Sequence, residues 1–120
     1  MLYAVFCYNR EEAVDAWPKE KDEAVMAKHA AAMKQLAARS KLGPAARLMN
    51  TSTATTLRTD RETVLLDGPF AETKEQLLGF YVLDCDSLEE AIEAAKNFTV
   101  EGGALEIRPV RFFELGSAVR

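Results

Sequence analysis

The stretch "LGFYVLDCDSLEEAIEAAKNF", Leu78 to Phe98, combines a strand with the helix that follows it, and it decides the fold. From Leu78 to Cys85, apolar side chains occupy both alternating positions, which is typical of a strand buried on two sides. Ser87 stands where a helix N-cap belongs, and Glu90, three residues later, completes a capping box. The helix is predicted to bury one stripe of side chains: Leu88, Ala91, Ile92, Ala95 and Phe98.

A similar strand and helix open the chain. Leu2 to Tyr8 is also apolar on both alternating faces and is predicted to be a buried strand. After a polar connection, a helix is expected from about Lys19 to Ser40, ended by Gly43 and Pro44. Its apolar stripe consists of Val25, His29, Ala32, Met33 and Leu36.

The remaining segments favour strands. They are Ala46–Met49, Ala54–Arg58, Thr63–Leu66 and Ala104–Phe113. The order strand, helix, strands, strand, helix, strand predicts an α+β fold of the ferredoxin-like, split βαβ type. We expect an antiparallel sheet with an extra central hairpin and both helices on one face. Residues 1–115 are predicted to form this single domain, with residues 116–120 as a C-terminal tail.

Burial on both faces of the two best strands has a further consequence. Two helices cover only one face of such a sheet, so the other apolar face needs a cover. A second copy of the same sheet supplies one economically, and the sequence therefore predicts a homodimer. A loop over the open face is the alternative.

Charge and motifs exclude several classes of function. With 120 residues, a net charge of -4 and dispersed Lys and Arg residues, the chain lacks the basic face of a nucleic-acid binder. Its two cysteines, Cys7 and Cys85, belong to no Cys-x-x-Cys pair, so we expect reduced thiols and neither a disulfide nor a metal site. Phosphate-binding and dinucleotide motifs do not occur, and no cofactor is expected.

The N-terminus "MLYAVFCYNR" has no basic region followed by a long apolar run, so it does not resemble a signal peptide. Nowhere does the sequence reach the roughly 20 apolar residues of a membrane helix. The expected location is the cytoplasm, without a membrane partner.

The segment from Asp67 to Leu77 is a candidate binding loop. Hairpin loops usually take about 2 to 5 residues, and this segment is longer. Pro69 restricts both its own backbone and that of Gly68, and Phe70 offers an apolar anchor. The loop also carries the charged residues Asp67, Glu72, Lys74 and Glu75. We expect an ordered loop that lines the main cavity; a plain hairpin turn is the alternative.

His29 is the one histidine of the chain, and it interrupts an apolar helical stripe. It is either a boundary residue bonded to a backbone carbonyl or a general acid or base, because histidine titrates near neutral pH. For the catalytic role, we expect a ring partly exposed in a cleft. One nitrogen would then bond a carboxylate or backbone oxygen, and the other would stay free.

Glu106 and Arg108 lie two positions apart on the last strand and therefore face the same side. Leu105 and Ile107 are expected to face the helices, which places the charged pair on the open side of the sheet. The pair either forms a salt bridge between subunits, or Arg108 holds a carboxylate or enolate of a ligand.

The motif "DGPFAETKEQLLGFYVLD", the Ser-capped helix after it and then "GGALEIRPV" together resemble the YCII-related family, whose members are also called DGPF-domain proteins. The resemblance covers most of the chain and implies a dimeric α/β barrel formed by two ferredoxin-like units. It also implies a His–Asp pair, which falls on His29 and, as the candidate aspartate, Asp67. The chain departs from the family pattern at Leu78, where a glycine is common, and at Phe98-Thr99, where a proline dipeptide is common.

Two functions follow from this resemblance. The first is a small cofactor-free lyase or isomerase in which His29 transfers a proton on a small aromatic or enolisable substrate. The second is a non-catalytic module that binds a small ligand or regulates a partner, since family members resemble units encoded beside or fused to extracytoplasmic-function sigma factors. The ligand-binding candidates are Gly68, Pro69, Phe70, Glu72, Lys74, Glu106 and Arg108.

Overall fold

A four-stranded antiparallel sheet with helices on one face forms the body of the protein, seen in a computed structural model that describes residues 1–118. The strands are β1 (Leu2–Asn9), β2 (Leu42–Arg47), β3 (Thr55–Thr59), β4 (Thr63–Asp67), β5 (Gln76–Asp84) and β6 (Ala104–Pro109). The helices are α1 (Glu11–Asp15), α2 (Lys19–Ala38) and α3 (Leu88–Ala95), with the 3-10 turns η1 (Thr51–Thr53) and η2 (Lys96–Phe98).

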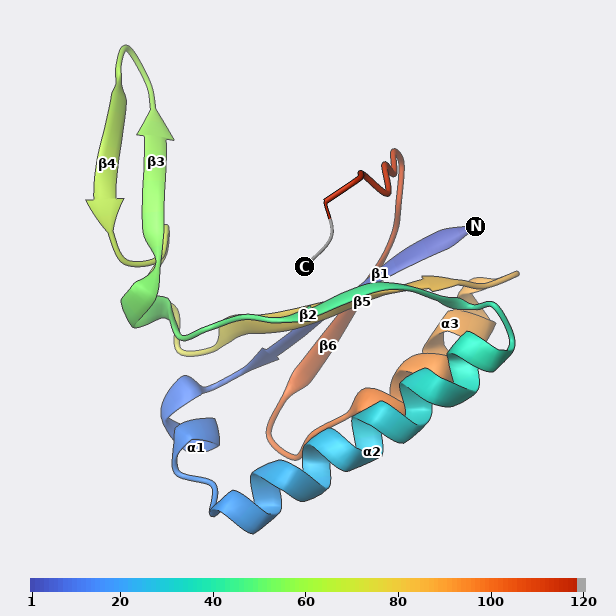
Figure 1. Ribbon diagram of the computed structural model, residues 1–120. Coiled ribbons are helices and arrows are strands. Elements are labelled where there is room, and N and C mark those ends of the chain that lie inside the picture. The colour runs from blue at the N-terminus through green and yellow to red at the C-terminus, as the bar shows by residue number, and fades with distance from the viewer. Residues whose placement is uncertain (119–120) are drawn as a thin grey trace.

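The strand order of the main sheet is β2-β5-β1-β6, and β3 and β4 form a separate two-stranded sheet. Figure 1 shows α2 and α3 together on one side of the main sheet, with the β3–β4 hairpin and the C-terminal segment on the other side. The predicted ferredoxin-like α+β fold with an extra central hairpin is thereby confirmed. Within residues 1–118, no helix is both long and apolar enough to cross a membrane.

The core lies between the main sheet and helices α2 and α3. Val5 and Leu83, from the central strands β1 and β5, are fully buried, and Phe98 after α3 is 1% exposed. Leu105 and Ile107 of β6 pack against this core, as predicted. The predicted stripe of the α3 segment is narrower than expected, because Ala91, Ala95 and Phe98 are buried whereas Leu88 and Ile92 are exposed.

Several predicted boundaries are wrong. Strand β2 begins at Leu42 and contains Gly43 and Pro44, which were expected only to end the preceding helix. Because β2 is an edge strand, a proline without an N–H group is tolerated there. Strand β6 ends at Pro109 instead of Phe113, and only the bond from Val110 N to Leu2 O continues its pairing with β1.

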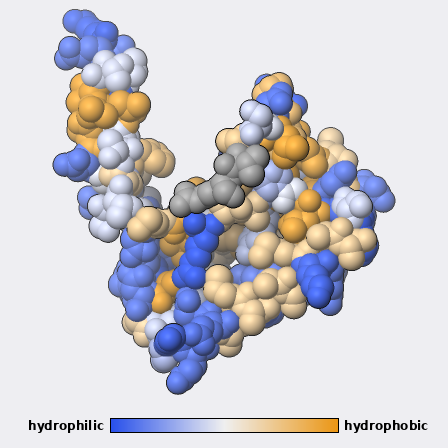
Figure 2. All heavy atoms as spheres, viewed as in Figure 1, coloured by the Kyte–Doolittle hydropathy of each residue, from blue (hydrophilic) through white to orange (hydrophobic). Residues whose placement is uncertain are grey.

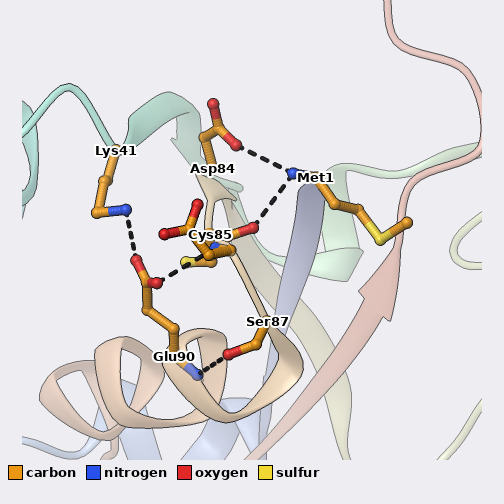
Figure 3. Close-up of polar contacts among 7 residues, drawn as sticks. Met1, Lys41, Asp84, Cys85, Ser87 and Glu90 are labelled. Atoms are coloured by element: carbon orange, nitrogen blue, oxygen red, sulfur yellow. Dashed lines mark hydrogen bonds and ion pairs between the residues drawn. The ribbon is translucent and has the colours of Figure 1, made fainter.

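A polar network fastens the first residue to one end of the sheet (Figure 3). The Met1 ammonium donates to Asp84 Oδ1 at 3.3 Å and to the carbonyl oxygen of Cys85 at 3.2 Å. Lys41 pairs with Glu90 at 2.5 Å and lowers the pKa of the Glu90 carboxyl by hydrogen bonding. The predicted N-cap is present, since the Ser87 hydroxyl accepts from Glu90 N. These contacts join β5, α3 and the chain start at one edge of the core.

The hairpin of β3 and β4, Thr55 to Asp67, forms an arm that stands away from the main sheet (Figures 1 and 2). Leu57 and Leu65 are paired across it and are 65% and 69% exposed. Its base is tied to α1, because Thr51 N donates to Glu11 Oε2 at 2.8 Å and Asn50 Nδ2 donates to Asp15 Oδ2 at 2.7 Å. A two-stranded hairpin alone is only marginally stable in water, so the arm depends on contacts at its base.

Gly79 tests the packing of the sheet. A Cβ atom added there would collide with the backbone oxygen of Ala46 on β2, and the backbone cannot turn aside as a flexible side chain can. Gly79→Ala should therefore lower the free energy of unfolding by about 1 to 3 kcal/mol. Lys34→Ala is the control, since Lys34 is exposed on helix α2 and an alanine there creates no steric conflict. Urea denaturation measures both variants, and equal stability of the two would contradict this packing argument.

Candidate functional site: a pocket between the sheet and helix α2

A pocket of about 250 Å³ lies at the end of the sheet away from Met1. Its walls come from the far ends of β1, β2 and β5, from α2, and from the segment between α3 and β6. Val14 and Trp17 line it from α1 and the residues that follow, and Val25 and Met33 line it from α2. Most of the lining is apolar, which is typical of sites for small organic molecules.

His29 extends into this pocket from the middle of α2. The residue is only 6% exposed, and Nδ1 lies 3.2 Å from the Tyr81 hydroxyl oxygen of β5. Nε2 is buried and has no hydrogen-bond partner in the structure. A buried polar group without a partner costs about 1 to 3 kcal/mol. Nε2 is therefore a polar atom of the site whose capacity for a hydrogen bond is unused.

An aromatic cluster holds the imidazole in place. The rings of Tyr81 and Phe98 are stacked, with centroids 4.0 Å apart and an interplanar angle of 24°. His29 meets Phe98 edge to face at 5.5 Å and Tyr81 at 6.2 Å. Edge-to-face contacts of this kind add to the energy of simple burial and restrict the ring orientation. The aromatic contacts therefore fix the direction in which the unpaired Nε2 of His29 points.

The surroundings of His29 favour its neutral form. Burial lowers the pKa of the imidazole, and the nearby positive charges of Lys28 and Arg47 lower it further. Burial also raises the pKa of Tyr81 to about 12 and that of Cys7, another lining residue, to about 11. All three groups are therefore uncharged at neutral pH, and Arg47 supplies the charge at the pocket.

Arg47 is positioned by an ion pair outside the pocket. Its guanidinium donates to Asp22 Oδ1 of α2 at 3.0 Å, and both side chains are partly exposed. Arg47 also belongs to the pocket lining, whereas no Asp or Glu lines the pocket in the described part of the chain. In residues 1–118, no three His, Cys, Asp or Glu side chains come close enough to hold a metal ion.

The expected surroundings of His29 are found in part. One ring nitrogen is free, as expected. The other meets a tyrosine hydroxyl in place of a carboxylate or backbone oxygen, and the ring is buried where partial exposure was expected. Sequence reasoning assigned no role to Tyr81, Trp17 or Arg47. For Tyr81 a signal existed, because alternation along β5 places it on the same face as Leu83 and Cys85, toward the helices.

The prediction that the loop from Asp67 to Lys74 lines the main cavity is wrong, since none of its residues is among the pocket lining. The turn of the hairpin is formed earlier, and the loop leads from the arm back to β5. Gly68, with φ of 95°, donates through N to Ala54 O at 2.8 Å, and Arg58 donates to Phe70 O at 3.0 Å.

The loop is thus fastened at its base, but its other candidate residues are placed apart from His29. Asp67, Glu72 and Lys74 are exposed, Pro69 is partly buried, and the Phe70 side chain is 74% exposed. The structure does not bring Asp67 together with His29. A binding role for this loop stays a prediction.

Glu106 and Arg108 lie on the face opposite the pocket. Both are exposed, and they alternate with Leu105 and Ile107, which pack against the core on the helix side. They stand opposite Phe6 and Ala4 of β1, respectively. The two charged residues and His29 are therefore on different faces of the sheet and do not form one site within a single chain.

Fold and pocket together define a small ferredoxin-like protein with a buried histidine under its sheet. The family model of the YCII-related domain matches residues 1–114, and the chain belongs to this family. It is also 50% identical to an uncharacterised protein of Rhizobium meliloti (strain 1021), over 97% of each chain.

The low pKa of His29 predicts how stability depends on pH. Because the folded chain binds this proton less readily than the unfolded chain, the free energy of unfolding should fall as pH drops below about 6.5. The loss continues until the pH lies below the folded-state pKa. The groups around the ring are Lys28 and Arg47, which repel the proton, and the neutral Tyr81 and Cys7.

Urea unfolding between about pH 5 and 8 checks this dependence. His29→Gln lacks the titrating ring and retains the carboxylates, so it is the matched control. Its stability should decline less steeply than that of the wild type over this range. Identical pH profiles would show that the ring titrates alike in both states.

Proposed function

We propose that the protein is a small cofactor-free enzyme of the lyase or isomerase type, with His29 as the group that transfers or shares a proton. One observation carries this proposal: a buried imidazole nitrogen in an apolar pocket has no hydrogen-bond partner among residues 1–118. Structural histidines in a core satisfy both nitrogens, because each unmet hydrogen bond costs stability. A histidine that serves a substrate leaves one nitrogen available.

The substrate class follows from the walls of the pocket. Trp17, Tyr81 and Phe98 favour a small, flat, largely apolar molecule. Arg47 lines the same pocket and favours a substrate that carries or develops negative charge. A small aromatic or enolisable compound meets both conditions.

A second candidate is a module that binds a small ligand without converting it, in a regulatory role such as the one the family resemblance implies. The lack of a lining carboxylate among residues 1–118 favours this candidate. A histidine that acts as a general base is commonly oriented by a further group, such as a carboxylate, which also stabilises the imidazolium. Turnover of an enolisable compound separates the two candidates.

We also propose that the partner is a second copy of the chain, joined through the open face of the sheet. Phe6 of β1 stands opposite Phe80 of β5, and both point away from the helices and are only partly covered. Glu106 and Arg108 lie beside them on the same face. A twofold axis can place Glu106 of one copy opposite Arg108 of the other, and the reverse. The exposed leucines of the arm lie on the same side of the sheet (Figure 2).

The catalytic role is tested by His29→Asn. Exchange of α-protons of enolisable aryl ketones, followed by NMR in deuterated buffer, provides a screen that works before the natural substrate is identified. The wild type should accelerate exchange for some member, and His29→Asn should lose about 100-fold or more of that rate. Gln35→Asn, on the exposed side of the same helix, is the control. Undiminished exchange by His29→Asn would remove the ring from the mechanism.

The partner is tested by light scattering. The wild type should have the mass of a dimer at micromolar concentration, and Phe6→Glu should give a monomer, since it buries a charge in the proposed interface. Leu88→Glu, on α3 at the other face, is the matched control and should stay dimeric. A monomeric wild type, or a dimer that tolerates Phe6→Glu, would exclude this interface.

A further inference from the structure

The contact between His29 and Tyr81 leaves one question open, namely which ring nitrogen carries the proton. Nδ1 lies 3.2 Å from the Tyr81 hydroxyl, and Nε2 has no hydrogen-bond partner in the described part of the chain. A neutral imidazole has one N–H donor and one acceptor nitrogen, and a phenol can donate or accept. Two arrangements are therefore compatible with this distance, and they present opposite chemistry to the pocket.

Counting hydrogen-bond partners separates the two arrangements. If Nδ1–H donates to Tyr81, the hydroxyl hydrogen of Tyr81 and the Nε2 lone pair both stay unpaired, because the hydroxyl has no other partner among the described residues. If the Tyr81 hydroxyl donates to Nδ1, only the Nε2–H group stays unpaired. Nε2 is buried, and the Tyr81 hydroxyl is partly buried in a mostly apolar pocket, where leaving a further group unpaired costs free energy, so the second arrangement is the more stable.

We propose that Tyr81 is a positioning residue that holds His29 as the Nε2–H tautomer, so that the pocket offers a hydrogen-bond donor to an oxygen acceptor of its ligand. The ligand class is thereby narrowed to small, largely apolar compounds that present a carbonyl or phenolate oxygen. This inference rests on the proposed function in taking the pocket as the ligand site. In this proposal the neutral imidazole of His29 acts as a hydrogen-bond donor, and its Nε2–H group stabilises negative charge that develops on an oxygen of the ligand.

The electrostatics of the pocket agree with this assignment. Lys28 and Arg47 oppose a positive imidazolium, and no carboxylate lines the pocket in residues 1–118 to stabilise one. A neutral imidazole can still donate from Nε2, and the cation Arg47 favours an oxygen that becomes negative. The phenol remains protonated at neutral pH because burial raises the pKa of Tyr81, so it keeps the hydrogen that it donates.

The chain has one histidine, so NMR can read this tautomer without assignment ambiguity. Long-range proton–nitrogen spectra of the nitrogen-15 labelled protein at neutral pH should show a protonated Nε2 and an unprotonated Nδ1 that accepts a hydrogen bond. Tyr81→Phe keeps the ring that stacks on Phe98 and removes only the hydroxyl. In that variant, the Nδ1 resonance should move to the position of a nitrogen without a donor.

Tyr3→Phe is the matched control, because Tyr3 is a buried core tyrosine outside the pocket and its loss should leave both nitrogen resonances in place. A protonated Nδ1 in the wild type would overturn the proposal and would assign the Nε2 lone pair to a base. A spectrum of Tyr81→Phe identical to that of the wild type would remove the positioning role. Neither result depends on turnover, so this test and the test of the enzymatic function can fail separately.

The ligand class is tested with two probes of equal shape. Acetophenone carries a carbonyl oxygen, and α-methylstyrene replaces that oxygen by a CH2 group. Titration with acetophenone should shift the Nε2–H resonance and give tighter binding than α-methylstyrene, by about tenfold for one hydrogen bond to a buried donor. Equal binding of the two probes, with no change at Nε2, would overturn the assignment of an oxygen acceptor.

Discussion

The pairing of β1 with β5 at the centre of the sheet is the constraint on which the site depends. In this register Val5 stands opposite Tyr81, and both side chains face the helices. Tyr81 can then stack on Phe98 and meet His29. A slip of one residue would turn Tyr81 to the open face and leave the imidazole without its hydroxyl partner, because side chains alternate along a strand. The geometry of one hydrogen bond thus rests on a long-range strand pairing.

The fold was predictable from local patterns wherever those patterns were strong. Continuous apolar runs identify β1 and β5, and the Ser87 cap marks the start of α3. Edge strand β2 was expected at Ala46–Met49 but runs from Leu42 to Arg47, since Gly43 and Pro44 are helix breakers by composition and only the pairing with β5 makes this segment part of a sheet. Helix α1 was missed for a similar reason: it buries none of its residues, so its sequence carries no apolar stripe.

The site was predictable only in its helical half. The apolar stripe of α2 identifies His29 as facing the sheet, and the structure confirms that it lies there. Its partner could not be read from the sequence, since Tyr81 is 52 residues away and their contact requires the correct register, helix placement and rotamers together. The many charges of the loop after Asp67 led to the wrong prediction that this loop lines the pocket. A high density of charge indicates exposure to solvent at least as often as binding.

One wall of the pocket has a different stability from the others. Trp17 and Val14 belong to the short segment around α1, which has no buried residue and is tied to η1 by polar bonds from Thr51 and Asn50. Opening this segment would expose little apolar surface, whereas moving β5 or α2 would disrupt the core. Local opening free energies follow the apolar contacts that are lost. The wall formed by Val14 and Trp17 is therefore the part of the pocket that is least costly to displace, and the polar bonds at its base contribute to that cost more than the core does.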